Sequence, residues 1–265
     1  MLSIEEIKLL IEKLKKVKKA DLQKLIDTNL QILEDLALAV DANNQKTIQH
    51  IGKTNKWFER DLMDKIKNPV MDDVLHQSIT RKIYQFAKTN VFPSLEIGPG
   101  NGMFSKELRA WKKNFFLELL PSVEKRLRKK FKPAEQKRLV FYLTKDYECS
   151  NIPQNSVNFI FSWDTFVFFS TNMIQHYLHN LKRCIVPGGY LFIQYSDCHF
   201  DYDLRQAKRQ YWEYNTKHLM KQILINEGYE IVELNQFRPG ANYFVARKPG
   251  NINPFKIAIS DFDLD

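Results

Sequence analysis

The chain has 265 residues, of which 44% are hydrophobic and 27% are charged. A chain of this length and composition buries one sizeable core with an appendage, which excludes a disordered or low-complexity protein. Lysine and arginine number 40 against 31 aspartate and glutamate, so the net charge is +9 and its meaning depends on where the cations lie.

Residues 1 to 92 are predicted to form a helical extension of the main domain. Apolar residues recur at steps of three and four between residues 4 and 14 and again between residues 22 and 36. Two interpretations stay open: this apolar stripe packs on its own domain, or it joins a second copy in a homodimer. A further helix is expected near residues 74 to 86, after the break at Asn68 and Pro69.

Residues 93 to 248 have a different texture, because short apolar runs alternate with helical patterns. Strand alternating with helix predicts an α/β domain with a mainly parallel sheet and helices on both faces. A last helix near residues 213 to 227 and a closing hairpin complete this domain, and residues 249 to 265 are expected to form a loosely packed tail. The expected strands are 94 to 97, 115 to 119, 139 to 143, 157 to 162, 190 to 194, 229 to 235 and 243 to 247, and the helices between them are 103 to 113, 122 to 131 and 172 to 185.

Hydrophobic runs are too short to cross a membrane, since a spanning helix needs roughly 20 apolar residues. The amino-terminal residues interleave charged and apolar side chains, which is not the pattern of a signal peptide. The cysteines are odd in number and show no C-x-x-C spacing, so we expect neither a disulfide framework nor a metal site. The sequence therefore predicts a cytoplasmic protein.

Three of the nine glycines, Gly98, Gly100 and Gly102, fall in one five-residue span after the first strand of the α/β domain. Glycine at this point lets the backbone turn tightly and lets a ligand lie against it. Met103 breaks the G-x-G-x-x-G dinucleotide fingerprint, and the chain has no G-x-x-x-x-G-K-[ST] phosphate loop.

The segment Leu95-Glu96-Ile97-Gly98-Pro99-Gly100-Asn101-Gly102 resembles the first motif of class I S-adenosylmethionine-dependent methyltransferases, which is an acidic residue followed by G-x-G-x-G. Further matches follow in the family's order over about residues 93 to 196, and Pro187-Gly188-Gly189 resembles its turn into the fifth strand. The resemblance implies a Rossmann-like, seven-stranded, mainly parallel sheet. It also implies S-adenosyl-L-methionine as cofactor and S-adenosyl-L-homocysteine as product.

The resemblance assigns the cofactor-binding residues. Glu96 suits the amino group and sulfonium of the cofactor, because a carboxylate attracts positive charge. Glu118 stands 22 residues beyond Glu96, at the end of the second strand, where the family binds the ribose. Asp146 takes the position that commonly meets the adenine amino group. Besides these residues, the predicted site contains Gly98, Gly100, Gly102, Leu119, Tyr147 and Trp163.

Methyl transfer from a sulfonium is a direct displacement, so a base is needed only when the acceptor carries a proton. The acceptor is expected beside the ends of strands four and five. This region lacks the Asn/Asp-Pro-Pro-Tyr/Phe motif of nucleic-acid amino-methyltransferases, and Phe168 replaces the His of many small-molecule members. The candidate catalytic residues are Asp164, Tyr195, Asp197 and His199, although an ordinary surface histidine remains an alternative for His199.

Cations and aromatic residues follow the fifth strand and suit a phosphate or carboxylate on a small acceptor, although a solvated helix face remains the alternative. By analogy with the family, Trp57 is expected to belong to a substrate lid. The candidate substrate-binding residues are thus Trp57, Arg205, Lys208, Arg209 and Tyr214.

We therefore predict methyl transfer to an oxygen or nitrogen of a small polar metabolite that is phosphorylated, nucleotide-linked or a sugar, with a role in surface-glycan biosynthesis. The alternatives are a nucleic-acid or protein methyltransferase and a non-catalytic dimerising scaffold. Residues 125 to 138 alone hold eight basic residues and one acidic residue, and they lie far in sequence from the expected acceptor site. We expect this segment to be a solvated helix end or a contact surface, and nucleic acid and membranes not to be partners.

Overall fold

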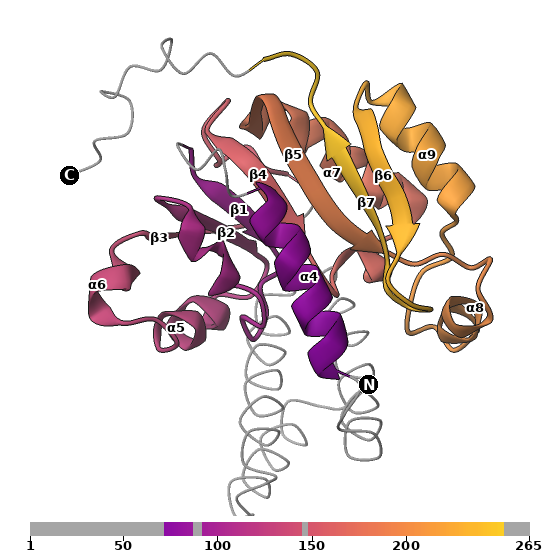
Figure 1. Ribbon diagram of the computed structural model, residues 1–265, viewed down its shortest axis with the longest axis horizontal. Helices are drawn as coiled ribbons and strands as arrows, with labels where there is room; N and C mark the ends of the chain where they lie inside the picture. Colours follow the sequence, from indigo (N-terminus) through magenta and orange to yellow (C-terminus); the bar gives the residue numbers. More distant parts are fainter. Residues whose placement is uncertain (1–71, 87–91, 145–147, 252–265) are drawn as a thin grey trace, which may run out of the picture.

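The computed structural model describes residues 72–86, 92–144 and 148–251 (Figure 1). The helices expected up to residue 71, with the expected dimer contact and lid, lie outside the described residues, as do Asp146, Tyr147 and the expected tail from residue 252. No helix within the described part of the chain is long and apolar enough to cross a membrane.

Seven strands form one sheet in the order β3-β2-β1-β4-β5-β7-β6. Strand β7 runs antiparallel to β5 and β6, while the pairs β1-β2, β2-β3, β1-β4 and β4-β5 are parallel. The expected seven-stranded, mainly parallel sheet is thus confirmed. Its strands are β1 (Ser94–Ile97), β2 (Asn114–Glu118), β3 (Leu139–Leu143), β4 (Val157–Ser162), β5 (Ile185–Tyr195), β6 (Glu230–Gln236) and β7 (Asn242–Arg247).

Helices cover both faces of the sheet. Figure 1 shows α4 in front of the sheet and α7 and α9 behind it, while α8 lies near the end of the sheet at which β5 finishes. The helices are α4 (Asp72–Phe86), α5 (Ser122–Arg128), α6 (Pro133–Gln136), α7 (Thr171–Cys184), α8 (Asp201–Lys208) and α9 (Lys217–Asn226), with short 3₁₀ turns at Glu107–Ala110 and Phe166–Phe168.

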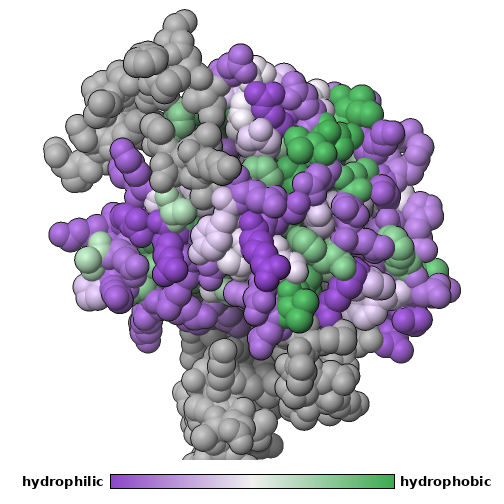
Figure 2. Space-filling view, in the orientation of Figure 1, coloured by the Kyte–Doolittle hydropathy of each residue, from purple (hydrophilic) through white to green (hydrophobic). Residues whose placement is uncertain are grey.

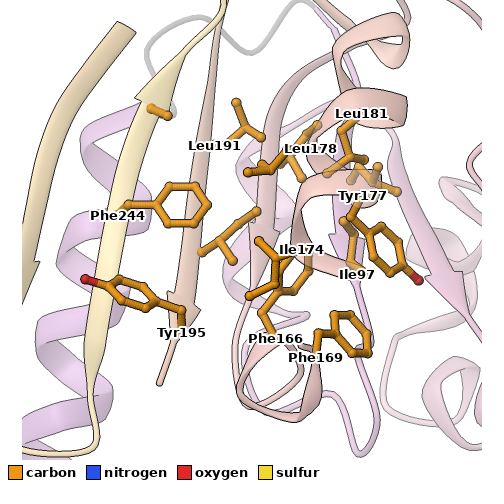
Figure 3. Packing of buried hydrophobic residues seen from close by; sticks show 14 of the residues in the cluster. Ile97, Phe166, Phe169, Ile174, Tyr177, Leu178, Leu181, Leu191, Tyr195 and Phe244 are labelled. Carbon is orange, nitrogen blue, oxygen red and sulfur yellow. The ribbon is translucent and has the colours of Figure 1, made fainter. Parts of the chain in front are cut away.

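The larger hydrophobic cluster lies between the sheet and helices α7 and α9 (Figure 3). Leu191 of β5 and Phe244 of β7 are fully buried there against Leu178 and Leu181 of α7. The strands supply apolar side chains on both faces because the sheet is covered on both sides. Each large side chain buried in this way contributes about 1.5–3 kcal/mol of transfer free energy.

A second cluster lies under α4, where Ile79 and Ile83 pack with Trp111 and Phe159. Helix α4 has the position and length expected from its sequence. It is also tied to the far edge of the sheet, because Lys82 Nζ lies 2.8 Å from Glu233 Oε1 on β6. These contacts hold α4 across the strands that carry the candidate site.

Three expected elements differ from the structure. The helix expected at residues 103 to 113 is a series of turns with one 3₁₀ turn, because Phe104, Leu108 and Trp111 reach the core without regular helix. Pro187-Gly188-Gly189 lies inside β5 at an irregularity of the β4-β5 pairing rather than before the strand. The helix expected at 122 to 131 ends at Arg128.

Candidate functional site

The site is defined by the point at which the strand order reverses. The chain continues from β1 to β2, which pairs with one edge of β1, while β4 pairs with the other edge of β1. In open α/β sheets the loops that leave such strands diverge at their carboxyl ends and leave room for a ligand. The loops that follow β1 and β4 therefore frame the candidate site.

The glycine turn after β1 needs glycine for two separate reasons. Gly98, Gly100 and Gly102 have φ angles of +65°, +50° and +65°, which disfavour residues with a side chain. A Cβ atom on Gly98 would also collide with Thr165, and one on Gly102 would collide with Leu127 of α5. The turn is thus packed between the β4 loop and α5.

Glu118 lies at the end of β2 with its carboxylate held by backbone N–H groups. Leu119 N donates to Oε1 at 2.7 Å, and Gly100 N donates to Oε2 at the longer distance of 3.4 Å. Burial raises the pKa of Glu118, and these N–H donors oppose that shift by favouring the ionised form. The carboxylate therefore faces the glycine turn with one oxygen only weakly engaged.

Glu96 is the second buried acid of the site. It lies on β1 with 4% of its surface exposed, and Ser105 Oγ donates to its Oε2 at 2.6 Å. Burial raises the pKa of Glu96 to about 8, against the opposing effect of the Ser105 hydrogen bond. Glu96 therefore carries a proton near neutral pH unless a positive charge approaches it.

The loop after β4 is held from two sides. Thr165 Oγ1 donates to the carbonyl oxygen of Gly98 at 3.2 Å. The backbone N–H of Asp164 donates to Gln194 Oε1 at 2.5 Å, and Gln194 Nε2 donates to the carbonyl oxygen of Gly240 at 2.9 Å. Asp164 has a φ angle of +55°, a conformation uncommon outside glycine that recurs at functional sites. One side chain thus joins the β4 loop to the hairpin between β6 and β7.

Trp163, a predicted cofactor residue, is 8% exposed. Its ring lies 6.1 Å from that of Phe104 and 5.9 Å from that of Phe192, measured between centroids. The indole is therefore part of the hydrophobic cluster under α4, and its role in cofactor binding stays a prediction.

Asp197 and His199 form a hydrogen-bonded pair just beyond β5. Asp197 Oδ1 lies 3.0 Å from His199 Nδ1 and also accepts from the backbone N–H of His199. The Asp197 side chain is 3% exposed, whereas that of His199 is 64% exposed. Because an ionised carboxylate only accepts, the contact favours a proton on Nδ1 and leaves Nε2 as an acceptor facing outward.

Asp203 of α8 holds the segment that carries this pair by hydrogen bonds. Its Oδ2 accepts from the backbone N–H of Asp197 at 2.7 Å and from Asn242 Nδ2 on β7. Burial, together with the nearby negative charge of Asp197, raises the pKa of Asp203 to about 6. The segment that carries His199 is thereby fixed to both α8 and β7.

Tyr195 does not reach the site. Figure 3 places its ring beside Phe244 in the hydrophobic core, and Tyr195 is 1% exposed. Burial raises the pKa of its hydroxyl, so the phenol stays neutral and is not available as an ionised base. We therefore remove Tyr195 from the candidate catalytic residues.

The predicted substrate residues after β5 lie at the surface. Arg205 and Lys208 of α8 and the following Arg209 are exposed, and Tyr214 is 57% exposed. Trp57, Asp146 and Tyr147 lie outside the described residues, so their roles stay predictions.

Sequence reasoning missed four residues that hold the site together: Ser105, Thr165, Gln194 and Asp203. Gln194 carried a signal, because it is a polar residue inside an apolar strand and is 2% exposed. The other three carried none, because a local sequence pattern does not show which group a buried hydroxyl or carboxyl side chain contacts.

Comparison with known proteins gives one family. A family model described as "Methyltransferase domain" matches residues 71–234. A search of curated proteins finds no match.

Solved structures share the fold at low sequence identity, which at this level shows the fold alone. One chain of the complex between the Haloferax volcanii Trm112 methyltransferase activator and a methyltransferase is 13% identical, with a TM-score of 0.55, and the match covers 73% of this chain and 97% of that one. An S-adenosylmethionine-dependent methyltransferase from Mesorhizobium loti is 13% identical, with a TM-score of 0.53 and coverages of 64% and 96%. Geranyl diphosphate C-methyltransferase from Streptomyces coelicolor A3(2) is 7% identical, with a TM-score of 0.53 and coverages of 66% and 79%.

Proposed function

The chain belongs to the class I S-adenosylmethionine-dependent methyltransferases, and we propose that it methylates an oxygen or nitrogen of a small polar metabolite. The observation that carries the acceptor side of this proposal is the Asp197–His199 pair beyond β5. It supplies a proton acceptor where the parallel strands end, next to the loop that leaves β4.

The glycine turn and the two buried acids fit the cofactor. When bound, S-adenosylmethionine supplies a methyl group on a positively charged sulfonium. Gly100 leaves the backbone bare for close approach, because the position of its missing Cβ atom is open. Glu118 offers a weakly engaged oxygen to the ribose hydroxyls, and Glu96 offers a buried carboxyl to the amino group. Asp146, Tyr147, Leu119 and Trp163 complete the proposed cofactor site.

His199 is the proposed general base. With its Nδ1 proton directed at Asp197, its Nε2 accepts the proton of an acceptor hydroxyl or ammonium group. The buried Asp197 carboxylate holds the imidazole in position and stabilises the imidazolium that forms. Such a base contributes typically 10²–10⁴-fold to the rate. Asp164 is the second candidate at the β4 loop.

The acceptor is proposed to be anionic or sugar-like. Exposed cations of Arg205, Lys208 and Arg209 lie on and just after the helix that supports the His199 segment. They suit a phosphate group, as in a phosphorylated or nucleotide-linked metabolite, including precursors of surface glycans. The Streptomyces coelicolor enzyme of the same fold acts on a diphosphate, as its name states.

The test is a methyl-transfer screen with release of S-adenosylhomocysteine as the readout. The panel contains phosphorylated amines, nucleotide-linked metabolites and sugars, with RNA and a protein mixture as separate arms. Turnover with a phosphorylated amine, a nucleotide-linked metabolite or a sugar supports the proposal if that turnover is lost in His199→Gln. Turnover only with RNA or protein would replace the proposed acceptor, and lack of S-adenosylmethionine binding in calorimetry would favour a non-catalytic scaffold.

A further inference from the structure

The positive charge of the chain is concentrated in one part of the fold. Residues 106 to 138 hold 12 basic and 4 acidic residues, a net charge of +8 out of +9 for the whole chain. We call residues 106–113 and 125–138 the basic surface. The two segments are joined in space, because Arg138 Nη1 donates to the carbonyl oxygen of Arg109 at 3.3 Å.

A helix dipole does not account for this surface. Helix α5 has only seven residues and ends at Arg128, so cations within its last turn are favoured by its carboxyl end. The five later cations lie beyond that helix: Lys129, Lys130, Lys132, Lys137 and Arg138. The expectation of a solvated helix end therefore covers only part of the cluster.

Four lysines of the basic surface have no carboxylate partner among the residues that the structure describes. Arg128 pairs with Glu124 at 2.8 Å. By contrast, Lys112, Lys125, Lys129 and Lys137 are solvent-exposed, and no carboxylate within the described ranges lies within 4.0 Å of their ammonium groups. Lysines crowded in this way repel one another. Binding of a polyanion is favourable because it relieves this repulsion and releases bound counterions.

The surface lacks the apolar component that other partners require. Every large hydrophobic residue found exposed in the described parts of the chain lies outside residues 106 to 138. Protein interfaces have an apolar centre and are depleted in lysine, and membrane-surface helices insert apolar side chains. Figure 2 likewise shows mainly hydrophilic residues on the side of the molecule where α5 and α6 lie.

We propose that the basic surface binds the phosphate backbone of a nucleic acid. It borders the cofactor-binding turn, because Lys130 Nζ donates to the carbonyl oxygen of Asn101. It lies on the β2-β3 half of the sheet, whereas α8 follows β5 on the other half. A bound strand would thus dock beside the cofactor site, and this inference does not depend on the proposed acceptor. It departs from the expectation that nucleic acid is not a partner.

The test measures binding of the full chain to a short fluorescein-labelled single-stranded RNA by anisotropy, between about 50 and 200 mM salt. The variant Lys125→Gln/Lys129→Gln removes two cations of the basic surface that are four residues apart. The matched control, Lys217→Gln/Lys221→Gln, removes two exposed lysines with the same spacing on α9. Circular dichroism shows that each variant is folded.

We expect log Kd to depend steeply on log salt, and the slope to fall by about 1.4 in the first variant, at about 0.7 per lost phosphate contact on single strands. Affinity at about 0.1 M salt should fall by about tenfold or more. The control should bind RNA like the wild-type chain. Equal losses in both variants, or the absence of salt-dependent RNA binding, would overturn the inference. Binding of an acidic polypeptide or of anionic vesicles, without binding of RNA, would do so as well. If the wild-type chain binds RNA but does not bind S-adenosylmethionine in calorimetry, the proposed function is wrong and this inference stands.

Discussion

The hydroxyl group of Ser105 donates a hydrogen bond to Glu96 Oε2, nine residues away, at an oxygen–oxygen distance of 2.6 Å. This hydrogen bond partly offsets the rise in the pKa of Glu96 that desolvation causes. Burial still prevails, since the pKa of Glu96 is raised to about 8. An acid whose pKa is higher in the folded than in the unfolded chain takes up protons on folding. Its contribution to stability is therefore lost as the pH rises from about 4.5 to about 8.

The first prediction concerns proton release on cofactor binding. A positively charged ligand beside Glu96 favours its ionised form, so binding near pH 7 should release up to one proton and strengthen as the pH rises toward 8. Calorimetric titration with S-adenosylmethionine in two buffers of different ionisation enthalpy measures that proton. Glu96→Gln, which is neutral and of similar shape, should abolish this share of the release. The same proton release in wild type and variant would refute the assignment.

The second prediction concerns His199. Replacing it with Gln removes the proton acceptor but leaves the cofactor site intact, so kcat should fall by about 10²–10⁴-fold with unchanged affinity for S-adenosylmethionine. Asp197→Asn should lower kcat in the same direction, because the amide no longer stabilises an imidazolium. His218→Gln is the matched control on the exposed face of α9. If His199→Gln and the control turn over equally, His199 is only a surface residue.

The third prediction concerns the glycine turn. Gly98→Ala places a methyl group against Thr165 and forces alanine into a φ of +65°, so the free energy of unfolding should fall by about 1–3 kcal/mol. Cofactor affinity should fall as well. The double variant Gly98→Ala/Thr165→Ala removes the colliding atoms and should recover part of the loss, as urea unfolding measures. If the double variant loses as much unfolding free energy as the two single variants together, or more, the collision is not the cause.

The fourth prediction concerns the packing of α4. Ile83 lies on the buried face of this helix and is fully buried, so Ile83→Ala should lower the unfolding free energy by about 2–5 kcal/mol. Val74 on the same helix is 71% exposed, and Val74→Ala should change stability by no more than about 0.5 kcal/mol. Thermal unfolding followed by circular dichroism compares the two. Similar small losses in both would mean that α4 is not docked on the sheet.

Much of the fold could be predicted from local sequence patterns. The strands of the α/β domain were visible as apolar runs, and the glycine turn was visible because three glycines in five residues are rare in a chain that has nine. The helix expected at 103 to 113 failed because the spacing of Phe104, Leu108 and Trp111 shows only that these side chains are buried, not that the backbone between them is regular helix.

The contacts that shape the site could not be predicted in this way. Thr165 meets Gly98 across 67 residues, and Asn242 meets Asp203 across 39. Such pairs depend on strand order, which no local period encodes. Tyr195 illustrates the same limit, since its place at the end of a strand suggested access, while its ring lies buried in the hydrophobic cluster beside Phe244 of β7.

Gln194 restricts the sequences that can occupy this fold. Its side chain must accept at one end, from the N–H of Asp164, and donate at the other, to the carbonyl of Gly240. Glutamate has the same shape but would place an acceptor against that carbonyl oxygen. Leucine would leave both backbone groups without their hydrogen-bond partner. The position is thus specified by polarity at both ends of one side chain. A chain of the same topology without an amide at this position must hold the β4 loop and the β6-β7 hairpin together by other contacts.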